Sequence, residues 1–136
     1  MSSPPRRARG RPPLIVSSDP DVVDLYVLSM RNARAPVLSA TSADAALQLV
    51  RDRAVSAVVV DVSNPATDWD LCRILRTQAG PEVPLIVLTG WLDAEARAQA
   101  TGVGCAAFVS KPVTPERLME IVRRTRGGER DILVLD

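Results

Sequence analysis

Residues 57–61 read Ala57-Val58-Val59-Val60-Asp61, a run of small and β-branched apolar residues that stops at a carboxylate. A short continuous run of this kind is typical of a strand that is buried on both faces. Leu85-Ile86-Val87-Leu88 is a second such run, and it stops at Thr89-Gly90. Because strands with two buried faces occur in parallel sheets covered by helices on both sides, these runs predict an α/β domain.

Three weaker apolar runs extend the pattern outward. We expect strands at Leu14-Ile15-Val16, at Pro36-Val37-Leu38 and around Ala106-Ala107-Phe108-Val109. A segment with helical spacing of apolar residues follows each of the five strands. The expected helix starts are Asp19-Pro20, Thr41 or Ser42, about Asp68, Asp93 and Thr114-Pro115, and Gly127-Gly128 ends the last helix. Five strands alternating with five helices predict a doubly wound, five-stranded parallel sheet.

Composition limits the class of protein. The chain has 136 residues, 46% of them hydrophobic. This length is sufficient to bury one hydrophobic core and is too short for two ordinary domains. No apolar stretch approaches the length of a membrane span, and we expect a cytoplasmic protein with no membrane association. There is no histidine, which excludes histidine-based triads and a histidine phosphorelay within this chain. Cys72 and Cys105 are too few for a disulfide framework.

Charge is distributed unevenly along the chain. Residues 1–13 carry four arginines and four prolines, and we predict that they form a disordered basic arm. Residues 14–136 carry 13 basic and 16 acidic side chains, a net charge of −3. The domain is expected to span residues 14–126, followed by a tail over 127–136. The apolar run Ile132-Leu133-Val134-Leu135 in this tail either adds a strand to a partner's sheet or packs back onto the domain.

Polar residues end four of the five predicted strands. These are Ser17-Ser18, Asp61, Thr89 and Lys111, and Lys111 is the one lysine among 17 basic residues. In an open parallel sheet, ligands bind outside the carboxyl ends of the strands. We therefore expect these side chains to share one edge of the sheet and to form the functional site.

The order and spacing of these residues resemble the receiver domain of two-component response regulators over residues 14–126. The resemblance implies a flavodoxin-like sheet with strand order 2-1-3-4-5 and a role in bacterial signal transduction and phosphorelay. It places the phosphoacceptor at Asp61, the switch residues at Thr89 and Phe108, and the phosphate-binding lysine at Lys111, which Pro112 follows. A nucleotide-binding Rossmann fold is excluded because no G-x-G-x-x-G follows the first strand.

One departure from the family bears on chemistry. Receiver domains usually end the first strand with two acidic residues that hold Mg²⁺ together with the phosphoacceptor, and here those positions are Ser17 and Ser18. Asp19 is better placed to cap the first helix than to reach a metal. Asp61 is then the one carboxylate available as a metal ligand, with Lys111 beside it. We predict a degenerate acidic pair, weak Mg²⁺ binding and poor phosphorylation.

A second departure is Trp69, at a position where the family usually has glycine. Trp91 lies two residues after Thr89, so both tryptophans are expected to flank the same edge. One interpretation is that each ring fills a gap left by a changed loop. The other is a lid or a partner-binding pair, because tryptophan supplies contact area at low entropic cost.

Four functional hypotheses follow. The first is a stand-alone atypical receiver, not an enzyme, that contacts a sensor kinase or downstream effector; we expect no output domain after residue 126. A homodimer through the fourth helix, fifth strand and fifth helix belongs to this hypothesis. The second is a single-domain response regulator that is phosphorylated at Asp61. The third, which we favour less, is DNA binding through Arg9-Gly10-Arg11-Pro12, which resembles an AT-hook core. The fourth is a small-molecule sensor with its ligand near Trp69 and Trp91.

Overall fold

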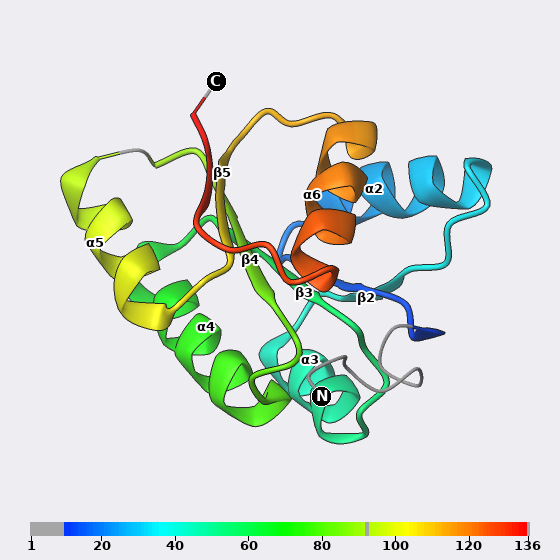
Figure 1. Cartoon of the computed structure of the whole chain (residues 1–136), viewed down its shortest axis with the longest axis horizontal. Coiled ribbons are helices and arrows are strands. Elements are labelled where there is room, and N and C mark those ends of the chain that lie inside the picture. Colours follow the sequence, from blue (N-terminus) through cyan, green and yellow to red (C-terminus); the bar gives the residue numbers. More distant parts are fainter. Residues whose placement is uncertain (1–9, 92, 136) are drawn as a thin grey trace.

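Strand β3 (Val58–Val62) lies inside a parallel sheet with the strand order β2-β1-β3-β4-β5-β6. The computed structural model describes residues 10–91 and 93–135. Within them the other strands are β1 (Leu14–Val16), β2 (Leu38–Ala40), β4 (Leu85–Thr89), β5 (Ala107–Ser110) and β6 (Ile132–Val134). The helices are α2 (Pro20–Asn32), α3 (Ala43–Arg51), α4 (Pro65–Ala79), α5 (Ala94–Val103) and α6 (Pro115–Arg126) (Figure 1).

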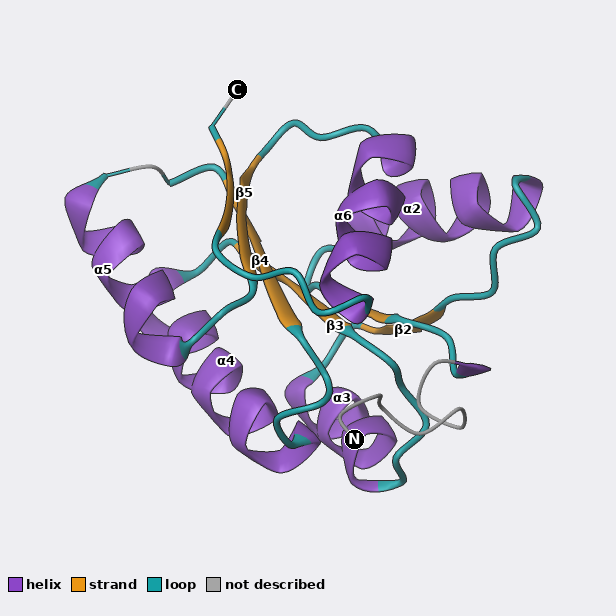
Figure 2. Ribbon diagram, in the orientation of Figure 1, coloured by secondary structure: helices purple, strands orange, loops and turns teal. Residues whose placement is uncertain are grey.

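Helices cover both faces of the sheet, as the apolar strands predict. Figure 2 shows α2 and α6 on one side of the strands and α3, α4 and α5 on the other. Alternate residues of each strand supply the two cores, so Val58 and Val60 pack on the side of α3 and α4, and Val59 packs on the side of α2 and α6. The predicted doubly wound, flavodoxin-like fold is confirmed.

The sheet has six strands in the described residues, and the prediction of five is corrected here. Residues 132–134 pair in parallel with β5, in the register Ala107 with Ile132, Phe108 with Leu133 and Val109 with Val134. Ile132 and Val134 are buried beside α6, which is why the tail packs back onto its own domain. The expected tail over 127–136 therefore contributes a strand to the domain.

Two element boundaries also differ from the prediction. Helix α4 begins at Pro65 rather than near Asp68, because the side chain of Asn64 accepts a hydrogen bond from the Ala66 amide and caps the helix. Strand β2 begins at Leu38, two residues beyond the expected start at Pro36, because Leu38 is the first residue in register with Leu14 of β1.

The other predicted helix caps hold. Asp19 accepts from the Asp21 amide at 2.9 Å, Ser42 from the Ala45 amide at 3.2 Å, and Thr114 from the Arg117 amide at 3.1 Å. Asp93 caps α5 in the same way. Each cap satisfies one of the amides that the first turn of a helix leaves without a partner.

The predicted basic arm lies largely outside the described residues, and so does Arg9 of the AT-hook-like segment. Its last residues contact the domain, since the carbonyl of Pro12 accepts from the Ser56 amide at 3.0 Å and that of Pro13 from the Leu38 amide at 2.9 Å. Pro12 and Pro13, which lead into β1, are thus joined to the segment before β3 and to the start of β2. No helix in the described part of the chain is long and apolar enough to cross a membrane.

Candidate functional site

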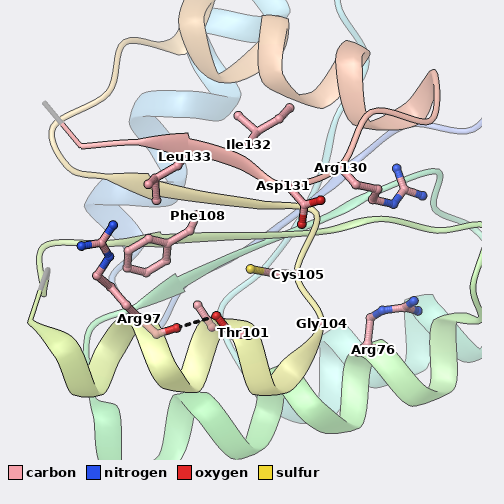
Figure 3. A pocket seen from close by; sticks show the side chains of 11 residues that line it. Arg76, Arg97, Thr101, Gly104, Cys105, Phe108, Arg130, Asp131, Ile132 and Leu133 are labelled. Atoms are coloured by element: carbon pink, nitrogen blue, oxygen red, sulfur yellow. Dashed lines mark hydrogen bonds between the residues drawn. The ribbon is translucent and has the colours of Figure 1, made fainter.

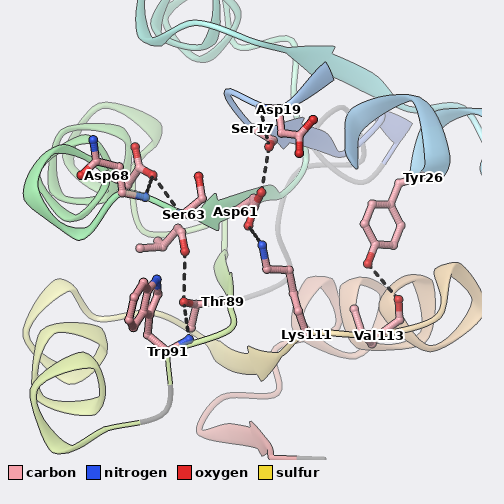
Figure 4. Close-up of polar contacts among 12 residues, drawn as sticks. Ser17, Asp19, Tyr26, Asp61, Ser63, Asp68, Thr89, Trp91, Lys111 and Val113 are labelled. Atoms are coloured by element: carbon pink, nitrogen blue, oxygen red, sulfur yellow. Dashed lines mark hydrogen bonds and ion pairs between the residues drawn. The ribbon is translucent and has the colours of Figure 1, made fainter. Parts of the chain in front are cut away.

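The carboxyl ends of the central strands bring the predicted site residues together. Asp61 lies near the end of β3, and Thr89 is the last residue of β4. Ser17 follows β1, and Lys111 follows β5. Because all these strands run in the same direction, the four side chains gather at one edge of the sheet (Figure 4).

The carboxylate of Asp61 has a protein donor on each oxygen. Ser17 Oγ donates to Oδ2 at 2.8 Å, and Lys111 Nζ lies 2.6 Å from Oδ1. The Asp61 side chain is 1% exposed and that of Lys111 is 28% exposed, so the ion pair is largely removed from water. A carboxylate at this depth needs both partners, because an unpaired buried charge is strongly destabilising.

The three residues after β1 have different surroundings. The Ser17 hydroxyl is buried and, besides donating to Asp61, accepts from the Asp19 amide at 3.1 Å. Ser18 is exposed and lines a cavity beside Asp61. Asp19 caps α2, as the sequence predicts. Of these three side chains, Ser17 provides the hydrogen bond to the carboxylate.

The cavity beside Asp61 has a volume of about 140 Å³. Its polar walls come from the ends of β1 and β3, the start of α3 and the start of α4, namely Ser17, Ser18, Thr41, Ser42, Asp61, Thr67 and Asp68. Asp68 Oδ2 accepts from the backbone amides of Ser63 at 3.0 Å and Asn64 at 2.8 Å, which holds the loop after β3 in place. Within residues 10–91 and 93–135, no three acidic or cysteine side chains are grouped as a metal site would require.

Thr89 and Phe108 belong to the neighbouring strands β4 and β5 and have different surroundings. The buried Thr89 hydroxyl donates to the Val62 carbonyl at 3.0 Å and accepts from the Trp91 amide at 3.0 Å. Phe108 is buried and lines a separate cavity of about 550 Å³. Figure 3 shows Phe108 beside Leu133 of β6, with Arg97 of α5 close to both.

The two tryptophans line the same cavity. Both line a cavity of about 210 Å³ between the starts of α4 and α5. Trp69 is 4% exposed and belongs to the core beneath α4, whereas Trp91 is 51% exposed. Trp69 therefore fills space inside the domain, and Trp91 presents its ring at the surface.

Tyr26 is a residue near the site that the sequence did not single out. Its hydroxyl donates to the Val113 carbonyl at 2.8 Å and so joins α2 to the loop before α6. Burial raises the pKa of Tyr26, and the negative charge of Asp61 raises it further. The helical spacing around Tyr26 predicts a core residue, and nothing in that pattern marks the hydroxyl.

Comparison with known proteins gives the family. Residues 14–123 match the response regulator receiver domain. A 14.6 kDa protein of Leptolyngbya boryana, described as uncharacterized and located in the sodA1 3′ region, is 32% identical over 113 residues, which cover 82% of this chain and 86% of the relative. The DNA-binding response regulator MtrA of Mycolicibacterium smegmatis is 29% identical over 118 residues, 85% of this chain and 51% of MtrA. The chain thus spans about half the length of MtrA.

Solved structures share the fold. A CheY-like response regulator receiver domain protein of Methanospirillum hungatei superposes with a TM-score of 0.76 at 21% identity, covering 86% of this chain and 94% of that one. A response regulator of Burkholderia pseudomallei, solved with a phosphorylated aspartic acid, a calcium ion and citrate, gives a TM-score of 0.73 at 19% identity over 86% of this chain and 69% of that one. The family match over most of its length shows that this chain belongs to the response regulator receiver domains of two-component signalling.

Proposed function

We propose that this receiver domain acts through contacts with a protein partner and that Asp61 undergoes little or no Mg²⁺-dependent phosphorylation. The observation that carries this proposal is the closed pairing of the Asp61 carboxylate with Ser17 and Lys111. A buried carboxylate with a donor on each oxygen is already stabilised by the protein, so a further cation would add little stabilisation at this site.

Charge supports the same conclusion. Mg²⁺ in proteins is usually held by one or two carboxylates with phosphate and water oxygens. At this site the single negative charge of Asp61 is balanced by Lys111, and Asp68 accepts from two backbone amides. Ser17 and Ser18 add hydroxyls but no charge. The donors present therefore do not fit a dication well, and we derive no chemical step through one.

Within this proposal the family residues keep structural roles. Lys111 neutralises Asp61 and joins the loop after β5 to β3. Thr89 holds the ends of β3 and β4 together through its bonds to Val62 and Trp91. Phe108 packs with Leu133 of β6. The protein would then be a binding module without turnover. A sensor kinase or effector would recognise its surface, and recognition would not require a phosphoryl group on Asp61.

The contact surface that we propose lies between α5 and α6. The sequence places a homodimer face on these helices and β5, but β6 pairs with the outer edge of β5. Leu133 and Leu135 are 51% and 41% exposed there, and they present apolar surface along the edge of the sheet. We propose that a protein partner, including a second copy, meets the domain at β6 rather than at β5.

The second candidate is a phosphorylatable regulator with Asp61 as phosphoacceptor. It is favoured by the presence of Asp61, Thr89 and Lys111 at the ends of β3, β4 and β5, where a phosphorylated aspartate would contact a hydroxyl and an ammonium group. In this case Lys111 would have to move from Oδ1 toward the phosphoryl group.

Fluorescence titration separates the two candidates. Trp91 reports on the site because its amide is bonded to Thr89. The proposal predicts no saturable change in emission when Mg²⁺ and then beryllofluoride are added to millimolar concentrations. The variants Ser18→Asp, at an exposed position, and Ser17→Asp/Ser18→Asp should gain a response, and Asp61→Asn in either background should remove it. A saturable response in the unaltered protein would establish the second candidate.

A further inference from the structure

The cavity of about 210 Å³ between the starts of α4 and α5 has an unusual chemical lining. Two tryptophans, Trp69 and Trp91, form part of its wall together with the carboxylate-bearing residues Asp93 and Glu95. Pro65, Ala96 and Gln99 complete the described lining. Aromatic rings and carboxylates therefore share one small concavity, and no basic residue is among the described residues that line it.

Neither carboxylate of this cavity forms an ion pair with a basic side chain within residues 10–91 and 93–135. Asp93 Oδ1 accepts from the Ala96 amide at 2.9 Å as the cap of α5. The guanidinium of Arg73 donates to Gln99 of the lining and is also paired with Asp70. The positive end of the α5 dipole offsets part of the negative charge but less than two full charges.

We propose that this tryptophan and carboxylate cavity binds an organic cation that carries a guanidinium or ammonium group. Cations are attracted to aromatic rings, most strongly to tryptophan, and carboxylates add direct charge pairing. An anion would be repelled by Asp93 and Glu95. A neutral apolar group would remove water from these carboxylates without supplying a hydrogen bond or a charge in its place. The volume is below the roughly 300 Å³ at which drug-sized ligands are bound, so the cavity suits a head group or the end of one side chain.

The position of the cavity connects it to the receiver site. The Trp91 amide donates to the Thr89 hydroxyl, which in turn donates to the carbonyl of Val62, the residue after Asp61. Figure 4 shows this chain of bonds from the indole-bearing loop to the end of β3. An occupant that shifts Trp91 would therefore alter the surroundings of Thr89 without a phosphoryl group on Asp61. This cation site does not rest on the proposed function, because its lining does not include Asp61.

The test is a titration of the full chain with methylguanidinium and with methylurea, its neutral counterpart, at constant ionic strength. The two tryptophans of the chain both line the cavity, so a change in their emission should report binding. Methylguanidinium should give a saturable change with a Kd on the order of millimolar, and methylurea should not. Amide resonances of Trp91 and Thr89 should shift in the same titration.

Variants locate the charge that is responsible. Asp93→Asn keeps a capping side chain on α5 while removing its negative charge, and Glu95→Gln removes the negative charge of the second carboxylate. The double variant should bind methylguanidinium about tenfold more weakly, whereas Glu120→Gln, a matched change on exposed α6, should leave the Kd unchanged. An equal response to methylurea, no response to methylguanidinium, or an unaltered Kd in the double variant would each overturn the proposal.

Two further monocations distinguish the source of the ligand. Acetyl-arginine amide presents the guanidinium as it occurs in a protein, and propylguanidinium presents it as a free small molecule. Tighter binding of acetyl-arginine amide supports the site and assigns its occupant to an arginine of a protein partner. Equal or tighter binding of propylguanidinium also supports the site and assigns it to a free cation.

Discussion

The Ser17 hydroxyl donates a 2.8 Å hydrogen bond to Oδ2 of Asp61, at a position where the receiver family usually has an acidic residue. An acidic residue so close to Asp61 would repel its charge unless a cation lay between the two. A hydroxyl instead stabilises the charge without any cation. Together with the Lys111 ammonium on Oδ1, this contact gives each oxygen of the Asp61 carboxylate a donor from the protein itself.

Ser17→Ala should lower the free energy of unfolding by about 1 to 3 kcal/mol, because it removes a hydrogen bond to a buried, charged group. Ser18→Ala is the matched control at an exposed position, and its effect should stay within about 0.5 kcal/mol. Urea denaturation measures both. Equal effects of the two substitutions would show that the Ser17 hydroxyl does not support Asp61.

Lys111→Met should destabilise the domain by about 2 to 3 kcal/mol, since it leaves the buried Asp61 carboxylate without its cation. This range lies below that of a fully buried pair because the lysine side chain is partly exposed to solvent. Asp61→Asn/Lys111→Met should recover much of the loss, because no unpaired charge remains. A double-mutant cycle in urea measures the coupling. Additive effects of the two substitutions would contradict the ion pair.

Both cysteines should react slowly with thiol reagents at neutral pH. Burial raises the pKa of Cys72 to about 12, and burial also raises that of Cys105 to about 11. Because the thiolate is the reactive form, the rate of modification should rise about tenfold per pH unit up to each pKa. Kinetics of Cys72→Ser and Cys105→Ser with a disulfide reagent assign the rates, and Cys105, which is less buried, should react first. Rapid modification of Cys72 at pH 7 would contradict its burial.

The same pKa shift predicts how stability depends on pH. In the unfolded chain Cys72 ionises near its ordinary pKa of 9.0, whereas in the folded domain it stays protonated up to about 12. The unfolded state is therefore stabilised first as pH rises, and the free energy of unfolding should fall between pH 9 and 12. Cys72→Ala should flatten this decline in urea denaturation measured at several pH values. An unchanged slope in the variant would show that another group is responsible.

Strand β6 should contribute to the stability of the domain. Ile132→Ala should cost about 2 to 3 kcal/mol because Ile132 is buried beside α6. Leu133→Ala, on the exposed face of the same strand, should cost less than about 1 kcal/mol. Thermal unfolding of the two variants makes the comparison. A negligible effect of Ile132→Ala would mean that β6 is not held on β5 in solution.

The sequence predicted the parts of the structure that depend on local pattern. The β-branched run at 58–60 and the cap at Asp19 act within a few residues, and both are where we expected them. The grouping of Asp61, Thr89 and Lys111 could also be predicted, because parallel strands share a carboxyl edge. The start of α4 was predicted near Asp68 instead of at Pro65, although Asn64-Pro65 is a capping signal.

Features that depend on tertiary packing could not be predicted. The apolar run at Ile132 could pair with the edge strand of its own sheet or with that of a partner's sheet, and the sequence pattern is the same in both cases. The Ser17 hydrogen bond depends on the position of the end of β1 relative to Asp61 of β3, which is set by tertiary packing. The cavity lined by Asp93 and Glu95 forms where α4 packs against α5. The sequence around Trp69 therefore gives no indication that acidic residues lie beside this ring.

Phosphoryl labelling tests the central claim most directly. Intact mass spectrometry after incubation with acetyl phosphate and Mg²⁺ should show no added phosphoryl group on the unaltered chain. The variant Ser17→Asp/Ser18→Asp, which restores the acidic pair, should acquire one, and Asp61→Asn in that background should lose it. Stoichiometric labelling of the unaltered chain that Asp61→Asn abolishes would contradict the account and identify an active phosphoacceptor.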